Sequence, residues 1–269
     1  MRVKARFKRN TKIVVELIKL RFHQMMMFRL GFFGPFFVDS SVFLIQLLVF
    51  QAIYSNIDRI GSWGRGEMII FIGTFSMVDA LNMIIYFFGV NSIPDKIKNG
   101  EIDLYVTKPV SPLLRLTFEN VNPGSLPLLV FSTVIVLYGV HVGNFKITAT
   151  GALRYLFWVV LMTILWYELE VIIRSISFYV ISTANITRLE EAGIDLCMKI
   201  PGVVFKGVYK LLFYCILPYG LIATLPTLSL TGRNPIQMYL FGTGIVAIFG
   251  IITGVLWKMG LKRYNSVSS

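Results

Sequence analysis

Long apolar runs separated by short polar stretches dominate the pattern of hydrophobic and polar positions along this chain. A helix needs about 20 mostly apolar residues to cross a bilayer, and six runs are long enough. The pattern therefore predicts an all-α membrane protein with six transmembrane helices, at about residues 31–54, 67–90, 117–140, 152–175, 211–230 and 237–258. The turn-forming sequence Asn122-Pro123-Gly124 interrupts the third run, so an alternative start for that span is near Leu126. Pro218 and Pro226 lie inside the fifth run, where a membrane helix tolerates proline.

A polar stripe precedes the first apolar run. Residues 11–24 carry polar side chains at helical spacing, and apolar side chains fill most of the other positions. The stripe consists of Lys12, Glu16, Lys19 and His23. We expect such a helix to lie in the membrane interface and contact lipid without crossing the bilayer. The chain thus divides into a basic amphipathic segment, residues 1–30, and a six-helix domain, residues 31–269.

Charge sets the expected orientation of the spans. Of the 269 residues 55% are hydrophobic and 15% are charged, against about 25% charged in an ordinary soluble domain. The net charge of +12 does not favour nucleic-acid binding. Nine Lys and Arg residues lie in the first 30 positions, directly before an apolar run, and no soluble nucleic-acid-binding domain follows them. With the N-terminus inside, the inner segments hold 20 Lys and Arg residues and the outer segments five. This bias predicts a multi-pass protein of the bacterial inner membrane with both termini in the cytoplasm.

Polar residues inside the predicted spans are candidates for a pathway or a subunit interface, because charges in a bilayer are costly. Asp79 and Asn82 lie in the second span. A second group, in or at the end of the fourth span, comprises Glu168, Glu170 and Arg174. Glu170 and Arg174 are four residues apart and can pair on one helical face. Two interpretations of this group stay open: a polar patch that lines the pathway or contacts a partner subunit, or charges at the cytoplasmic headgroup level if the helix ends near Tyr167.

Several other chemistries find no support in the sequence. A G-x-x-x-x-G-K-(S/T) phosphate-binding loop is missing, so any ATP would have to bind another chain. Cys197 and Cys215 do not have a metal-binding or redox spacing. The four tryptophans fall mostly near predicted helix ends, as in an interfacial aromatic belt.

Two motifs carry a resemblance to a known family. The loop after the second span reads Ile97-Lys98-Asn99-Gly100-Glu101-Ile102-Asp103-Leu104-Tyr105 and continues with Lys108-Pro109-Val110-Ser111-Pro112. Near the end, Trp257 is followed by Gly260-Leu261-Lys262-Arg263-Tyr264-Asn265-Ser266. Both resemble the ABC-2 type permeases of ABC transporters, in the branch with an I-R-x-G-x-(L/I)-D loop that was formerly a family of unknown function. Lys98 stands at the usual Arg, and residues 117–195 add only hydropathy to the resemblance.

The resemblance implies a permease subunit of an exporter, not an enzyme. It would form the substrate pathway with a second permease, as a heterodimer in preference to a homodimer. A cytosolic ABC ATPase dimer would bind ATP and Mg²⁺, and this chain would hold no cofactor and no metal. Residues 91–115 then become a cytoplasmic coupling loop, in which Pro94 opens a short helix and Asn99-Gly100 ends it. The loop residues expected to engage the ATPase are Asp95, Lys98, Glu101, Asp103, Lys108 and Pro109.

Two other functions remain open on the sequence. A secondary transporter or channel would need an ion or proton site near the midplane, often with internal repeats, and no repeat is evident. A membrane-embedded lipid-modifying enzyme would need a cluster of catalytic groups near one membrane face. The pair Glu168 and Glu170 is the one carboxylate cluster there, and it lacks His or Cys support.

Overall fold

The computed structural model describes residues 13–24, 29–180, 182–233 and 235–267, with the side chains of 29–33, 35 and 265–267 left aside. Its described residues are all-α, without β-strands. A helix at 13–24 is followed by α2 (Arg29–Tyr54), α3 (Arg65–Ile85), α4 (Phe87–Asn91), α5 (Ile93–Lys98), α6 (Asp103–Val106), α7 (Pro112–Glu119), η1 (Pro123–Ser125), α8 (Leu126–Val142), α9 (Ala149–Ser175), η2 (Ile176–Phe178), α10 (Ala184–Lys199), η3 (Gly202–Val204), α11 (Gly207–Leu211), η4 (Leu212–Ile216), η5 (Pro218–Leu221), α12 (Thr224–Leu230) and α13 (Ile236–Val267).

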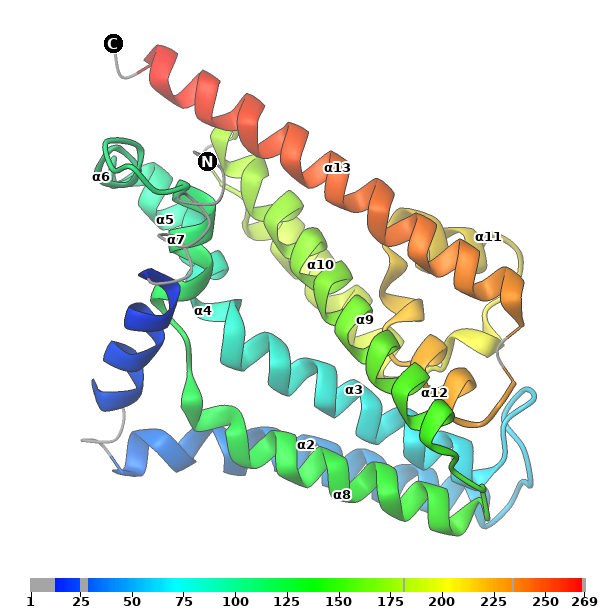
Figure 1. Ribbon diagram of the computed structural model, residues 1–269. Helices are drawn as coiled ribbons and strands as arrows, with labels where there is room; N and C mark the ends of the chain where they lie inside the picture. Colours follow the sequence, from blue (N-terminus) through cyan, green and yellow to red (C-terminus); the bar gives the residue numbers. More distant parts are fainter. Residues whose placement is uncertain (1–12, 25–28, 181, 234, 268–269) are drawn as a thin grey trace.

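Long helices form a bundle with two distinct ends (Figure 1). α9 and α13 run side by side along one edge, α2 and α8 run along the opposite edge, and α3 lies between them. The short helices α4 to α7, the helix 13–24 and the last turns of α13 gather at one end, which we call the loop end. The connections that precede α3 and α13 lie at the other end, which we call the hairpin end. There Arg233 contacts the carbonyl oxygen of Ser62 and the carboxylate of Glu67, at 3.2 and 2.7 Å.

Glycines bring α3 and α8 into close contact. A side chain at Gly66 would overlap the backbone of Gly143, and one at Gly139 would crowd the backbone nitrogen of Ile70. Gly73 faces the backbone of α8 in the same way. Small residues at a helix contact let two backbones approach, which is the usual device for packing helices in lipid. α3 is accordingly the most buried of the candidate spans, with 72% of its apolar window covered, against 22% for α2.

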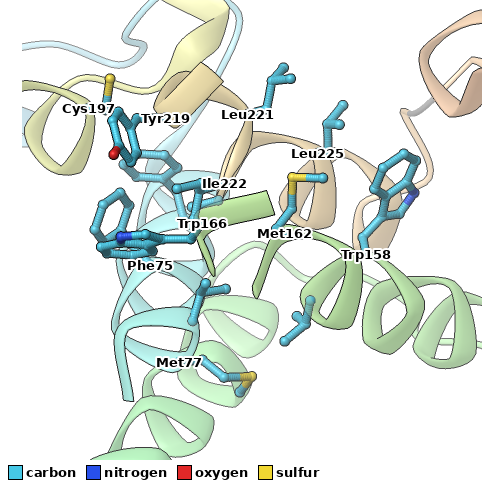
Figure 2. Close-up of a cluster of buried hydrophobic side chains, with 14 of the residues drawn as sticks. Phe75, Met77, Trp158, Met162, Trp166, Cys197, Tyr219, Leu221, Ile222 and Leu225 are labelled. Atoms are coloured by element: carbon cyan, nitrogen blue, oxygen red, sulfur yellow. The ribbon is translucent and has the colours of Figure 1, made fainter. Parts of the chain in front are cut away.

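Two hydrophobic cores hold the bundle together. The larger core joins α3, α9, α12 and the segment before α12, and Figure 2 shows Phe75, Trp166 and Tyr219 packed together in it. The smaller core lies at the loop end, around Ile93, Ile102 and Trp257. All four tryptophans are buried, so the expected interfacial belt is wrong for this chain. Their large apolar rings fill the space between helices instead.

The helices confirm a membrane-spanning bundle but shift two predicted spans. Five described helices are long and apolar enough to cross a bilayer. The second span, predicted to reach residue 90, ends at Ile85, and the chain continues as the separate helix α4. The third span starts at the alternative position, because Asn122 accepts a hydrogen bond from the backbone of Gly124 and forms the turn before α8. Residues 117–119 belong to α7 instead.

The predicted fifth span, residues 211–230, is not one crossing helix. It consists of two arms, Gly207–Ile216 and Pro218–Leu230, bent by 87° relative to each other. Pro218 explains the bend, because the residue before a proline is driven out of the helical region, and Leu217 has φ −124° and ψ 76°. The first arm begins and the second arm ends near the hairpin end (Figure 1), so we call residues 207–230 the re-entrant hairpin.

Helix α10 runs along the bundle beside α9 (Figure 1). Near its start, Glu190 pairs with Arg174 in the last turn of α9. Beyond its last turn, Val204 packs beside Gly61 at the hairpin end. In between, Gln46 of α2 donates a hydrogen bond to the carbonyl oxygen of Met198. Charged residues recur along α10, so the hydropathy pattern predicts no span there.

Candidate coupling site and buried charge cluster

Residues 91–115 fold into short helices rather than an open loop. Pro94 lies in the first turn of α5, as expected, since its missing N–H is unused there. Asn99 caps the end of α5, and Gly100 follows with φ +73°, the left-handed conformation that favours glycine. After α6, Pro112 opens α7 in the same manner. The predicted start and end of the short helix are therefore confirmed.

The loop has a buried underside and an exposed outer face. Ile93, Ile102 and Tyr105 are buried in the smaller core, packed with Val171 of α9 and Trp257 of α13. All of the residues expected to engage a partner are exposed, namely Asp95, Lys98, Glu101, Asp103, Lys108 and Pro109. Burial of aliphatic side chains fixes the loop on the ends of two long helices, and its charged side chains remain available on the outside.

Glu119 ties the parts of this loop together. Its carboxylate accepts hydrogen bonds from Lys96 of α5 and from the hydroxyl of Tyr105 of α6, the latter at 2.7 and 2.9 Å. Arg115 lies 3.7 Å from the same carboxylate, and both cations lie over the Tyr105 ring, at 4.7 and 4.9 Å from its centroid. Burial by itself would lower the pKa of Lys96, but the hydrogen bonds to Glu119 and Tyr105 raise it overall. Lys96 is therefore a charged anchor at neutral pH.

The N-terminal helix 13–24 reaches the same cluster. Arg21 donates to the carbonyl oxygen of Glu119 at 2.8 Å and also to the side chain of Asn120. Glu16, Lys19 and His23 are exposed, and Lys19 lies 3.4 Å from Glu16. Lys12 lies outside the described residues. The helix is confirmed over 13–24, whereas its position in a membrane interface stays a prediction.

Charged residues of the fourth span form a second, buried cluster. α9 continues to Ser175, so the helix does not end near Tyr167, whereas the depth of these charges in a membrane stays a prediction. Glu170 and Arg174 pair on one face as predicted, with 3.1 Å between Oε2 and Nη2. Arg174 also pairs with Glu190 of α10, and all three side chains are at least 95% buried. Glu190 was missed because the sequence pattern placed α10 in a solvated loop.

A model of the ABC-2 family transporter protein matches residues 41–268. This match covers the bundle, the coupling loop and the end of α13. The chain belongs to the ABC-2 transporter family. It is thus a multi-pass membrane permease. No curated protein and no solved structure matches the chain significantly.

The other predicted pathway residues of this ABC-2 permease are Glu168 on α9 and the neighbours Asp79 and Asn82 on α3. Glu168 points toward α13, where its backbone carbonyl accepts a hydrogen bond from Thr253 at 3.3 Å. One of its carboxylate oxygens is buried without a hydrogen-bond partner among the described residues. Asp79 is half-buried on α3, and Asn82, one turn further on, is 1% exposed with a buried amide oxygen that likewise lacks a partner there. Asp79 and Asn82 share α3, but no described hydrogen bond joins them to Arg174.

An apolar groove of about 580 Å³ runs between α2 and the end of α10. Val42, Ile45 and Val49 of α2 form one wall, and Met198 and Pro201 belong to the other. The ABC-2 permease thus presents its least buried span, α2, beside a hollow apolar face. Such a face suits lipid or another apolar helix.

Proposed function

We propose that this chain is the permease subunit of an ATP-driven exporter whose ATPase is a separate cytosolic protein. Residues 91–115 would be the coupling loop that seats in this ATPase dimer, where ATP and Mg²⁺ bind. A second permease, in preference a different chain, would complete the pathway through the bacterial inner membrane. Membership of the ABC-2 family supports transport, and the geometry of the loop supports coupling.

The observation that carries the proposal is the contrast between the two faces of the coupling loop. Its underside is fixed by buried Ile93 and Ile102 and by the bonds to Glu119. Its outer face exposes carboxylates and lysines that a partner protein can pair with, including Glu101, Asp103 and Lys108. A rigid element displaced by a partner moves the helices to which it is packed, whereas a loosely held loop would bend and absorb the displacement.

Charge supports the loop end as the cytoplasmic end. With α10 as the fifth crossing, Lys199, Lys206 and Lys210 move to the outer side. The inner count of Lys and Arg falls from 20 to 17, and the outer count rises from five to eight. The excess remains on the side of the loop, so both termini are again expected in the cytoplasm.

The second permease is expected on the side of α2. Only 22% of its apolar window is buried within this chain, and α2 borders the apolar groove. A second six-helix chain packed there would cover both surfaces. Co-purification from mild detergent, followed by mass determination of the intact complex, distinguishes two copies of this chain from a heterodimer.

Charge reversal tests the coupling role. We expect Glu101→Lys and Asp103→Lys to reduce the amount of ATPase that co-purifies with the permease, because like charges would face the partner's basic contacts. Asp58→Lys is the matched control, since Asp58 is equally exposed but lies between α2 and α3 at the hairpin end. Equal recovery of the ATPase with all three variants would remove the loop from the mechanism.

Energy dependence separates an exporter from a secondary transporter or channel. Cells that lack the partner ATPase should lose transport by this permease while keeping their proton gradient. Transport that persists without the ATPase and stops on addition of a protonophore would instead establish a secondary transporter.

A further inference from the structure

The guanidinium group of Arg174 joins three helices. Its Nε atom donates a hydrogen bond to Oδ1 of Asn91, the last residue of α4, at 3.2 Å. Nη2 lies 3.1 Å from Glu170 on its own helix, and Nη1 pairs with Glu190 of α10. Asn91 is also the first residue of the coupling loop. Arg174 therefore connects the beginning of that loop to the helix that runs toward the hairpin end.

The contacts continue from Glu190 to the bend of the re-entrant hairpin. The second carboxylate oxygen of Glu190 accepts a hydrogen bond from the hydroxyl of Tyr219 at 3.0 Å. Tyr219 follows Pro218 at the bend and is 1% exposed. Its ring packs edge-on against Trp166 (Figure 2), with the ring centroids 6.3 Å apart. The indole N–H of Trp166 donates a hydrogen bond to Glu170 at 3.3 Å. These residues close a ring of contacts around Arg174.

Stability alone gives a weak reason for such a cluster. Buried ion pairs lose so much hydration that well-packed apolar replacements are often as stable. The cluster has one cation and two carboxylates on different helices, so Arg174 can keep one ion pair if α10 moves relative to α9. A switching element needs such alternative pairings, because packed helices move between discrete arrangements.

We propose that Arg174 is a positioning residue that transmits displacement of the coupling loop to the re-entrant hairpin. This inference rests on the proposed function, since the ATPase supplies the displacement. Asn91 belongs to the coupling loop, so a displacement of the loop moves its contact with Arg174. Tyr219 lies at the bend of the hairpin and is joined to Arg174 through Glu190, so it receives this displacement. The contacts of Arg174 and Glu190 thereby link the coupling loop to the re-entrant hairpin.

Distance measurements on the full chain, assembled with the ATPase that co-purifies with it, test this link. Spin labels are placed at Leu153 of α9 and Val208 of α11, which are 67% and 78% exposed, after Cys197 and Cys215 are replaced by alanine. Distances are compared without nucleotide and with ATP plus vanadate. We expect the distance distribution to shift with nucleotide, because the hairpin moves relative to α9.

Two mild substitutions should break the link. Tyr219→Phe removes one hydroxyl and keeps the ring, and Asn91→Ala removes the contact between the loop and Arg174. Because a hydrogen bond to a charged group is lost in each, we expect the equilibrium between the two hairpin arrangements to change by about tenfold or more. Both variants should still co-purify with the ATPase, which a general loss of folding of the permease would not allow.

Tyr155→Phe is the matched control. Tyr155 is a buried tyrosine whose hydroxyl pairs with Thr74 at 3.0 Å, and neither contacts Arg174. A normal nucleotide response in Tyr219→Phe, or an equal loss in Tyr155→Phe, overturns the role of Arg174 while the proposed function stands. If no ATPase co-purifies with the unlabelled wild-type permease, the proposed function is overturned, and this inference with it.

Discussion

The hydroxyl of Tyr105 lies within 2.9 Å of both carboxylate oxygens of Glu119, fourteen residues further along the chain. This contact closes the coupling loop on itself, because Tyr105 belongs to α6 and Glu119 to the last turn of α7. Lys96 of α5 adds a charged bond to the same carboxylate. One side chain thus fixes the relative positions of three short helices, each too short to be stable alone.

Replacement of Glu119 should loosen the loop while leaving the long helices folded. Glu119→Ala leaves Lys96 and the Tyr105 hydroxyl half-buried without their carboxylate, which we expect to destabilise the loop by about 2 kcal/mol. Limited trypsin digestion should then cut after Lys96 or Arg115 several times faster than in the wild type. Glu191→Ala, an exposed change on α10, serves as the control and should leave the cleavage rate unchanged. Equal rates in all three proteins would contradict this role of Glu119.

Gly89 should tolerate no side chain. A Cβ atom there would overlap the carbonyl oxygen of Leu116, so α4 and α7 could not keep their present contact. We expect Gly89→Ala to lower the melting temperature of the detergent-solubilised permease, by an amount equivalent to about 1–3 kcal/mol for an overpacked site. Gly254→Ala makes the same chemical change in open space on α13 and should be neutral or slightly stabilising. If the two variants melt alike, the close approach of α4 and α7 is wrong.

The segment after α10 should be reached by reagents from outside the cell. Val208 is 78% exposed on α11 at the hairpin end, and Leu104 is 64% exposed on the coupling loop. In a protein without Cys197 and Cys215, we expect a membrane-impermeant maleimide to label Val208→Cys in intact cells. Leu104→Cys should react only after the cells are opened. Labelling of Val208→Cys only in opened cells would restore the arrangement expected from hydropathy.

Hydropathy and the two motifs predict most of this architecture because each long span carries its own signal. The pairing of Glu170 with Arg174 follows from their spacing, and the left-handed turn follows from Gly100. The third partner, Glu190, could not be found this way. It is twenty residues from Glu170 and enters the cluster only because α10 lies against α9. Charges satisfied by a distant helix give no local pattern along the chain.

The re-entrant hairpin was missed for a different physical reason. Its sequence is as apolar as that of a membrane span. Because membrane helices tolerate proline, Pro218 alone does not predict the 87° bend. Tyr219 gave no signal either, since a tyrosine in an apolar run resembles any core aromatic. Only its contact with Glu190 distinguishes it. Within the buried charge cluster, the sequence thus predicts the pair that is close in the chain, Glu170 and Arg174.

The choice between α10 and residues 211–230 as the fifth crossing has a practical consequence for mapping experiments. Each arrangement has an even number of crossings, so enzyme fusions to the last residue would report the same compartment in either case. Tags at the termini therefore do not distinguish a fifth crossing by α10 from one by residues 211–230. With the loop end in the cytoplasm, as proposed, an epitope inserted at about residues 206–209 would be displayed to antibodies on spheroplasts, which makes that short stretch the informative place for a tag.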